Sequence, residues 1–249
     1  MPVVALIEIV RSVPPRHAAD LLRELPADRL NAVMDGIGPA EIARVLYAAP
    51  GDFRATLIES LTDVRLLDVL YAQSDAESGQ LLASLPDGRL GDIVGFIPDT
   101  TLATLLSVLP ESRQAKVLQA LEPGRRGVAL SRKYEQEVAE ALARANLDVR
   151  PAVGEASGIV VAQGLGWLFA VAAGFGDDGT ITVGEAEAAA YRLGANAALA
   201  VTDQRPADAV LAYCREAQAQ GRAVAATMWT GRQHDGPLKR TVVSLFPPG

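Results

Sequence analysis

The consecutive segments PPRHAADLLREL, PADRLNAVMDGI and GPAEIARVLYAA, residues 14–49, determine the fold because they are three copies of one twelve-residue unit. The unit continues to Leu121, so that residues 14–121 divide into nine units of twelve. Positions eight and nine are apolar in all nine units, and position twelve is apolar in eight of them, with Gln73 as the exception. A fixed period of this kind favours a repeat architecture over an ordinary helical bundle.

Each unit is predicted to form one short helix. Pro, Gly, Ser or Thr opens every unit, and an acidic residue such as Asp87 often follows, where the positive end of a helix dipole favours it. Positions five, eight, nine and twelve then form one apolar stripe at helical spacing. A helix of about eight or nine residues is unstable alone in water. We therefore expect the units to pack on one another as a helical solenoid, capped at its start by a helix in residues 1–13.

The repeat resembles the intracellular N-terminal domain of MgtE-type magnesium transporters. The matching segments are HAADLLRELPADRLNAVMDGIGPAEIARVLYAAP, residues 17–50, and LLASLPDGRLGDIVGFIP, residues 81–98. The resemblance implies a superhelix of short helices, akin to the middle domain of the flagellar motor switch protein. The transporters continue into a paired nucleotide-binding-type module and a five-helix membrane domain. The remaining residues leave no room for either, so a transporter is not expected.

Charge and cysteine content restrict the function classes. The chain has 23 Lys and Arg against 30 Asp and Glu, and residues 1–133 and 134–249 carry net charges of −3 and −4. Neither half has the basic excess of a nucleic-acid-binding domain. Cys214 is the one cysteine, which excludes an intrachain disulfide and suits a reducing cytoplasm. We interpret it as a structural cysteine on a helix rather than as a nucleophile.

The repeat pattern decays after Leu121, and a domain boundary is expected there, with residues 1–133 as the solenoid and 134–249 as a small α/β domain with a mixed sheet. A basic cluster at the boundary, Arg125, Arg126, Arg132 and Lys133, is interpreted as a solvated face, with phosphate contact as the alternative. Helices and strands alternate beyond it. The expected helices are 134–146, 185–193 and 206–220, and the expected strands are 147–153, 159–162, 167–173, 197–202, 223–230 and 241–246.

Twenty uncharged residues, SGIVVAQGLGWLFAVAAGFG at 157–176, are long enough to cross a bilayer once. Five glycines and Gln163 interrupt them, and Gly164-Leu165-Gly166 is typical of a turn. We therefore favour two buried strands joined by that turn, and no membrane span.

The order of elements in the second half resembles the restriction endonuclease-like fold of the Mrr-type branch. The match runs from YEQEVAEALARANLDVRPA to EAAAYRLGANAALAVTDQRPADAVLAYCREAQAQG, residues 134–152 and 187–221. The family's chemistry requires an Asp on one central strand and an acidic residue or Gln followed by Lys on the next, for a divalent metal and the attacking water. Here Val160 and its neighbours are apolar, and no lysine lies between Lys133 and Lys239. The resemblance therefore implies the scaffold without its catalytic residues.

GFGDDGTITVGE, residues 174–185, is similar to the later half of an EF-hand calcium loop. Asp178 and Glu185 would be ligands, with Asp177 as an adjacent carboxylate, but the first two ligand positions are glycines. A turn followed by the first turn of a helix is the preferred interpretation, so a Mg²⁺ or Ca²⁺ site at Asp177, Asp178 and Glu185 is only the alternative.

The sequence thus predicts a non-enzymatic cytoplasmic scaffold without catalytic residues or a cofactor, which binds a partner protein through an exposed solenoid face. Two alternatives remain. One is a divergent nuclease or DNA-binding protein, with Glu155, Asp177 and Asp178 as its acids. The other is a magnesium-responsive regulator, by analogy with the transporters' domain.

Overall fold

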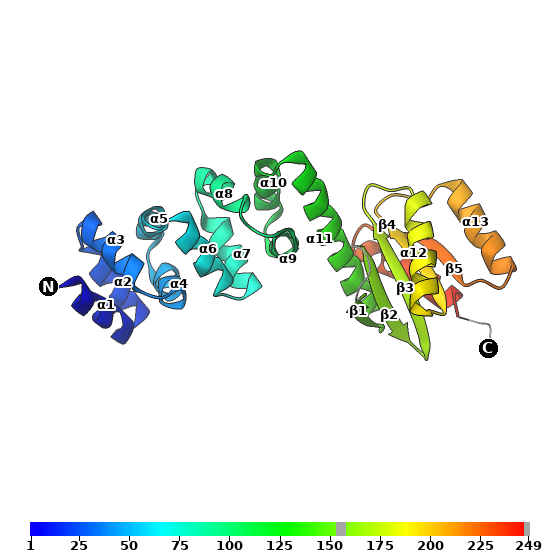
Figure 1. Ribbon diagram of the computed structural model, residues 1–249, viewed down its shortest axis with the longest axis horizontal. Coiled ribbons are helices and arrows are strands. Elements are labelled where there is room, and N and C mark those ends of the chain that lie inside the picture. The colour runs from blue at the N-terminus through cyan, green and yellow to red at the C-terminus, as the bar shows by residue number, and fades with distance from the viewer. Residues whose placement is uncertain (153–157, 247–249) are drawn as a thin grey trace. The chain divides into compact units, whose positions relative to one another are not determined.

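The computed structural model describes residues 1–152 and 158–246. The chain divides into two compact units, Met1–Arg126 and Gly127–Gly249. Helix α11, Pro123–Arg144, begins in the first unit and continues in the second without interruption. Figure 1 shows the short helices of the first unit and the sheet with its helices in the second.

The first unit consists of short helices, one for each twelve-residue repeat, as predicted. Helix α1, Val3–Ser12, precedes the repeats and packs on the first of them. The repeat helices are α2 Pro15–Arg23, α3 Ala27–Gly36, α4 Pro39–Ala48, α5 Gly51–Ser60, α6 Asp63–Tyr71, α7 Asp75–Ser84, α8 Asp87–Val94, α9 Asp99–Val108 and α10 Glu111–Ala120.

The first residue of each unit is the N-cap of its helix, which explains the restricted choice at that position. Proline at an N-cap has extended backbone angles and lacks an N–H that would need a partner. Thr62 and Ser74 cap with their side chains instead. Ser74 forms a reciprocal capping box with Glu77, whose carboxylate accepts from the Ser74 N–H at 3.1 Å.

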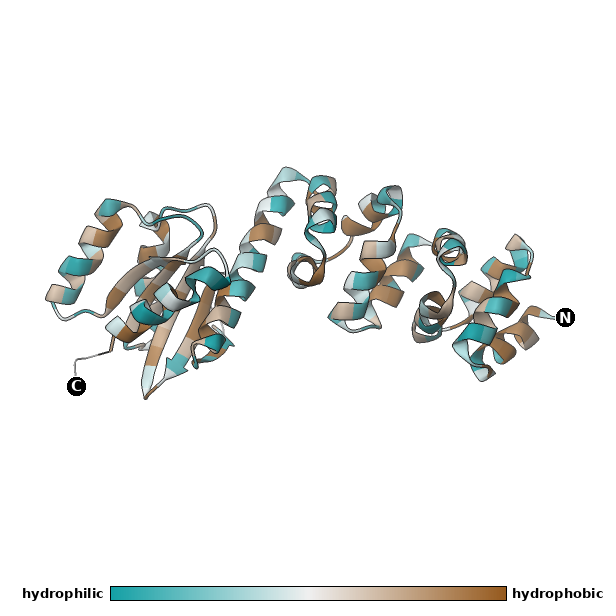
Figure 2. Cartoon of the chain, turned by 180° about the vertical axis from the view of Figure 1, so that it is seen from behind, coloured by the Kyte–Doolittle hydropathy of each residue, from teal (hydrophilic) through white to brown (hydrophobic). Residues whose placement is uncertain are grey.

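The apolar stripe forms the core of the first unit. Sixteen of the eighteen residues at positions eight and nine are buried, and the two half-buried ones, Leu21 and Leu118, belong to the first and last repeats. Most of these helices pack on the helix two units further along, as α2 on α4 and α7 on α9. The apolar side of each short helix therefore faces its neighbours, and the polar side is exposed (Figure 2).

The second unit contains a five-stranded mixed sheet of order β1-β2-β3-β4-β5, as predicted for its fold class. β1–β2 and β2–β3 are antiparallel, whereas β3–β4 and β4–β5 are parallel. The strands are β1 Asp148–Pro151, β2 Ile159–Gly164, β3 Trp167–Gly174, β4 Ala197–Thr202 and β5 Val224–Met228.

Helices cover both faces of this sheet. α12, Thr180–Leu193, connects β3 to β4, and α13, Asp208–Ala219, connects β4 to β5; both pack on one face. α11 and α14, Asp235–Ser244, pack on the other face, around Phe169 and Leu199. Strand β4, which lies between β3 and β5, is buried along its whole length, and its apolar composition follows from having helices on both sides (Figure 2).

The uncharged stretch forms the β2–β3 hairpin, which confirms the prediction of two strands; Ser157, its first residue, lies outside the described ranges. Leu165 and Gly166 form its tight turn, with φ of 50° and 79°. Within residues 1–152 and 158–246, no helix is long and apolar enough to cross a membrane.

Two expectations for the second half were wrong. Residues 241–246 do not form a strand, because most of them belong to α14. Thr241-Val242-Val243 is β-branched, but Leu238, Val242 and Leu245 are spaced for one side of a helix and are buried against the sheet. The helix expected at 134–146 begins at Pro123 instead.

Candidate functional site

Polar residues interrupt the apolar stripe at a few repeat positions, and their side chains bond to the main chain. Position five is polar at Arg54, Ser78 and Gln114. Arg54 Nε donates to the Leu46 carbonyl at 2.7 Å, and Ser78 Oγ donates to the Leu70 carbonyl at 2.6 Å. In both cases the acceptor is eight residues earlier, near the C-terminus of the preceding helix, where carbonyls lack helical partners.

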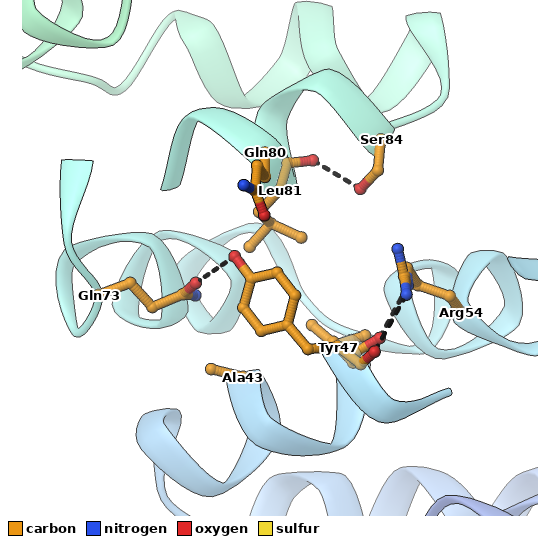
Figure 3. A pocket seen from close by; sticks show the side chains of 8 residues that line it. Ala43, Tyr47, Arg54, Gln73, Gln80, Leu81 and Ser84 are labelled. Atoms are coloured by element: carbon orange, nitrogen blue, oxygen red, sulfur yellow. Dashed lines mark hydrogen bonds between the residues drawn. The ribbon is translucent and has the colours of Figure 1, made fainter. Parts of the chain in front are cut away.

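Polar residues that interrupt the apolar stripe also lie around Tyr47 of α4 (Figure 3). Its hydroxyl lies 2.7 Å from Gln73 Oε1 and 2.6 Å from the Glu77 carbonyl oxygen. Gln73 is the polar exception at position twelve, and its amide nitrogen donates to the Val69 carbonyl at 2.8 Å. Burial, and secondarily the charge of Glu77, raise the pKa of Tyr47. The hydroxyl is therefore protonated at neutral pH and ties α4 to the start of α7.

A small cavity of about 220 Å³ lies beside the Tyr47 ring and is closed by Gln80, Leu81 and Ser84 of α7 (Figure 3). Tyr47 also lines a larger, shallow groove of about 680 Å³. That groove is formed by Pro14, Pro15, Arg16 and His17 at the start of α2, by Arg44 and Ala48 of α4, and by Glu77. We refer to it as the α2–α4 groove.

Two arginines of the α2–α4 groove differ from most arginines of the first unit. Eight of the eleven arginines in Met1–Arg126 have a carboxylate or carbonyl partner. Within the part of the chain that the structure describes, Arg16, Arg29 and Arg44 make no hydrogen bond or ion pair, and all three are exposed. Arg16 and Arg44 are in the groove, which therefore has two available guanidinium groups.

The partnered arginines follow a spacing that the sequence analysis missed. The Arg89–Asp63, Arg113–Asp87 and Arg125–Asp99 ion pairs, at 2.8, 2.9 and 2.7 Å, each join residues 26 positions apart. Arg89 and Arg113 stand at position four of their units, and Arg125 has the same place if the count of twelve is continued past Leu121. Each aspartate stands at position two of the unit two repeats earlier. This spacing could have been found in the sequence, since helices two units apart are in contact.

The basic cluster at the boundary is used in the same way. Arg125 pairs with Asp99, and Arg126 Nε donates to the Leu118 carbonyl at 2.7 Å. Arg132 lies 3.6 Å from Glu135, and Lys133 lies 2.7 Å from Glu137. All four cations have intramolecular partners, so the cluster is not an open phosphate-binding patch.

The acidic residues of the EF-hand-like segment cap the start of α12. Asp177 accepts hydrogen bonds from the N–H of Thr182, at 3.0 Å, and from its hydroxyl. Asp178 accepts from the N–H and hydroxyl of Thr180 at 3.1 and 2.6 Å, which lowers the pKa of Asp178. Glu185 is one helical turn further along α12 and is exposed. Among the described residues, no three His, Cys, Asp or Glu side chains are grouped so as to hold a metal ion.

The positions of a nuclease centre are apolar. Val160 on β2 and Ala170 and Val171 on β3 are all buried. A cavity of about 480 Å³ near the end of β3 includes Asp177 and Glu185 but not Asp178, and Glu155 lies outside the described ranges. The acids proposed for a divergent nuclease are therefore not brought together in the described part of the chain.

Cys214, Trp229 and His234 of the second unit have structural roles. Cys214 on α13 is buried, and burial raises the pKa of its thiol. Trp229 is buried at the end of β5, where its indole N–H donates to Asp235 at 2.8 Å and its carbonyl accepts from the Tyr134 hydroxyl at 2.9 Å. His234 lies 2.9 Å from the Thr230 hydroxyl in the turn before α14.

Residues 37–137 match the protein family described as the MgtE intracellular N domain. No curated protein matches the chain. Among solved structures, the chain is similar to one described as "Crystal structure of the soluble part of a magnesium transporter", at 18% identity and a TM-score of 0.41. The similarity covers 57% of this chain and 53% of that one, so the chain spans about half of that structure's length. These comparisons contain no match to the restriction endonuclease-like fold.

Proposed function

We propose that the protein is a non-enzymatic regulatory scaffold of the cytoplasm, and that its helical repeats bind a partner protein through the α2–α4 groove. The main support is the pair of exposed arginines, Arg16 and Arg44, which have no partner among the described residues although most arginines of the same unit do. The match of residues 37–137 to an intracellular domain family supports the regulatory role and the cytoplasmic location.

The geometry fits binding better than catalysis. The groove offers guanidinium groups, one imidazole and apolar surface, but its carboxylate, Glu77, is committed to the capping box of α7. A nucleophile with an adjacent base would be required for covalent catalysis, and the groove has none. Repeat proteins typically bind through side chains that successive helices expose along one surface. The sheet unit would supply a second surface.

The test is to fill the groove without removing a structural contact. His17 is exposed on α2 and lines the groove, whereas Asp20 is exposed on the same helix and does not. Full-length wild-type, His17→Trp and Asp20→Trp proteins would be used for quantitative affinity capture from lysate of the source cells. We expect at least one protein to be lost with His17→Trp and retained with Asp20→Trp. If every captured protein responds equally to both variants, the groove is not the docking surface.

The nuclease alternative has a direct test. Plasmid cleavage with magnesium or manganese, abolished by Asp177→Ala combined with Asp178→Ala, would replace the scaffold proposal with an enzymatic one. The capping roles of both carboxylates predict no cleavage by the wild-type protein.

A further inference from the structure

We infer that the α2–α4 groove binds an acidic segment of a partner polypeptide, in which carboxylates alternate with an apolar or aromatic residue. This inference rests on the proposed docking function and specifies the chemistry of the partner. It follows from the charge, the surface and the shape of the groove.

The charge of the groove comes from Arg16 of α2 and Arg44 of α4. A guanidinium group presents a planar set of donors that matches a carboxylate bidentately. Elsewhere in this unit other arginines reach a carboxylate of the same unit, as Arg113 reaches Asp87 at 2.9 Å. Arg16 and Arg44 have no such carboxylate within the described residues, so a bound acidic segment would supply it.

Glu77 is the acidic residue that lines the groove, and it does not neutralise the arginines. Its carboxylate accepts from the N–H and hydroxyl of Ser74, at 3.1 and 2.7 Å. No ion pair joins it to Arg16 or Arg44 in the described structure. The carboxylate is fixed at the N-terminus of α7, where the helix dipole stabilises it. It leaves the two guanidinium groups available and would repel a segment shifted towards α7.

Apart from the charged residues and His17, the lining of the groove is largely apolar. Pro14, Pro15 and Ala48 line it, and the Tyr47 ring, 37% exposed, forms one side. The Tyr47 hydroxyl is already held near Gln73 and Glu77, so the ring is fixed before a partner arrives. A rigid ring and two prolines lose little conformational entropy on binding. This arrangement suits an apolar or aromatic side chain placed between two carboxylates.

The same charges argue against nucleic acid as the occupant. Residues 1–126 contain 12 Lys and Arg and 17 Asp and Glu, a net charge of −5. A phosphate backbone needs a continuous row of cations along its length, whereas here two arginines are surrounded by a negative unit. A short acidic segment can place its carboxylates at the groove alone, and the negative surroundings would disfavour other binding positions.

The experiment is selection of random sixteen-residue peptides, displayed on phage, by the immobilised full-length protein. Wild-type protein would be compared with the double variant Arg16→Glu, Arg44→Glu and with Arg29→Glu. Arg29 is the matched control because it is also exposed and unpartnered but does not line the groove. Thermal unfolding of all three proteins verifies that they are folded, and a labelled twenty-nucleotide single-stranded DNA is the comparison ligand.

We expect peptides rich in Asp and Glu with an interspersed aromatic residue. Their binding should weaken at least tenfold in the double variant, change less than twofold in Arg29→Glu, and fall with rising salt. Enrichment of neutral or basic peptides that still depend on Arg16 and Arg44 would overturn the acidic chemistry but leave the docking function intact. Enrichment of no peptide by the wild-type protein would contradict both. DNA binding that depends on both arginines would overturn the choice of a polypeptide.

Discussion

Arg54 and Arg126 make the same main-chain contacts although they are 72 residues, or six repeats, apart. In each case Nε donates at 2.7 Å to the carbonyl eight residues earlier, of Leu46 or Leu118. A terminal nitrogen then donates to the carbonyls seven and five residues earlier. Arg54 thus replaces the apolar residue at position five of its unit, Arg126 has the equivalent place if the count is continued past Leu121, and each caps the C-terminus of the preceding helix.

Arg54→Ala is therefore expected to destabilise the first unit by about 1–3 kcal/mol, because the half-buried carbonyls of α4 lose a charged donor. Arg126→Ala should act in the same direction. Urea unfolding followed by helical circular dichroism at 222 nm measures both. The control is Arg29→Ala, which removes an exposed, unpartnered side chain and should change stability by less than about 0.5 kcal/mol. Equal effects of Arg54→Ala and Arg29→Ala would show that the capping contacts contribute nothing.

Gly174 at the end of β3 is predicted to tolerate no larger residue. A Cβ atom there would lie 2.0 Å from Thr182 Oγ1, and Thr182 is buried and hydrogen-bonded to Asp177. Gly174→Ala should cost about 1–3 kcal/mol through overpacking. Both tryptophans, Trp167 and Trp229, belong to the second unit, so their fluorescence reports its unfolding alone.

Gly184 is the matched control for this substitution. It lies in the interior of α12, and a Cβ atom would meet nothing within 4 Å. Gly184→Ala should stabilise the second unit by about 0.5–1 kcal/mol, because alanine loses less conformational entropy in a helix. A destabilising Gly184→Ala would contradict the packing described for α12.

The stability of the second unit should decrease in acid, partly because of Asp235. Its hydrogen bond with Arg144, and then that with the Trp229 indole, lower the pKa of this carboxyl. A carboxyl with a lowered folded-state pKa contributes stability above its unfolded pKa of about 3.9, and the contribution is lost as the pH falls through the folded pKa. The urea concentration at the unfolding midpoint, followed by tryptophan fluorescence, should therefore decrease when the pH is lowered below about 4. This decrease should be smaller in Asp235→Asn. Parallel pH curves for the two proteins would exclude this role.

The solenoid could be predicted from the sequence because each unit repeats the same solution to the same packing requirement. The first residue fixes the N-cap, and positions eight and nine fix the buried side, so local pattern and tertiary contact agree. The strand predicted at residues 241–246 was wrong for a different reason. The β-branched run Thr241-Val242-Val243 is a local signal for a strand, whereas the burial of Leu238 and Val242 against the sheet is a tertiary contact that requires a helix. The tertiary contact prevailed.

The candidate groove could not be predicted, since it depends on which charges remain unpaired. In the sequence, Arg89 stands at position four of its unit, whereas Arg16 and Arg44 stand at positions three and seven, and these positions alone do not show which side chains line a groove. The structure distinguishes them because Arg89 reaches Asp63 at 2.8 Å, while Arg16 and Arg44 reach no carboxylate among the described residues. The polar departures at Arg54, Gln73 and Ser78 were visible in the repeat. That Gln73 and Arg54 both contact Tyr47 could be learned only from the packing of the helices.

The carboxylates at the start of α12 are predicted to stabilise that helix independently of metal ions. Thr182 is buried and both its N–H and its hydroxyl depend on Asp177, so Asp177→Ala should cost about 1–3 kcal/mol. Asp178→Ala removes the contacts to Thr180, which is exposed, and should cost less.

Thermal unfolding followed by tryptophan fluorescence in chelator, in millimolar magnesium and in millimolar calcium measures this prediction. A bound metal would raise the unfolding temperature of the wild-type protein in proportion to its occupancy. We expect the same temperature in all three conditions, and the same decrements for Asp177→Ala and Asp178→Ala in each. A rise with magnesium or calcium that disappears in Asp178→Ala or Glu185→Ala would establish a metal site and favour the magnesium-responsive alternative over capping. The two roles can be distinguished. A hydrogen-bonded cap requires only the threonine donors that already contact both aspartates, whereas a metal site requires carboxylates that converge on one ion.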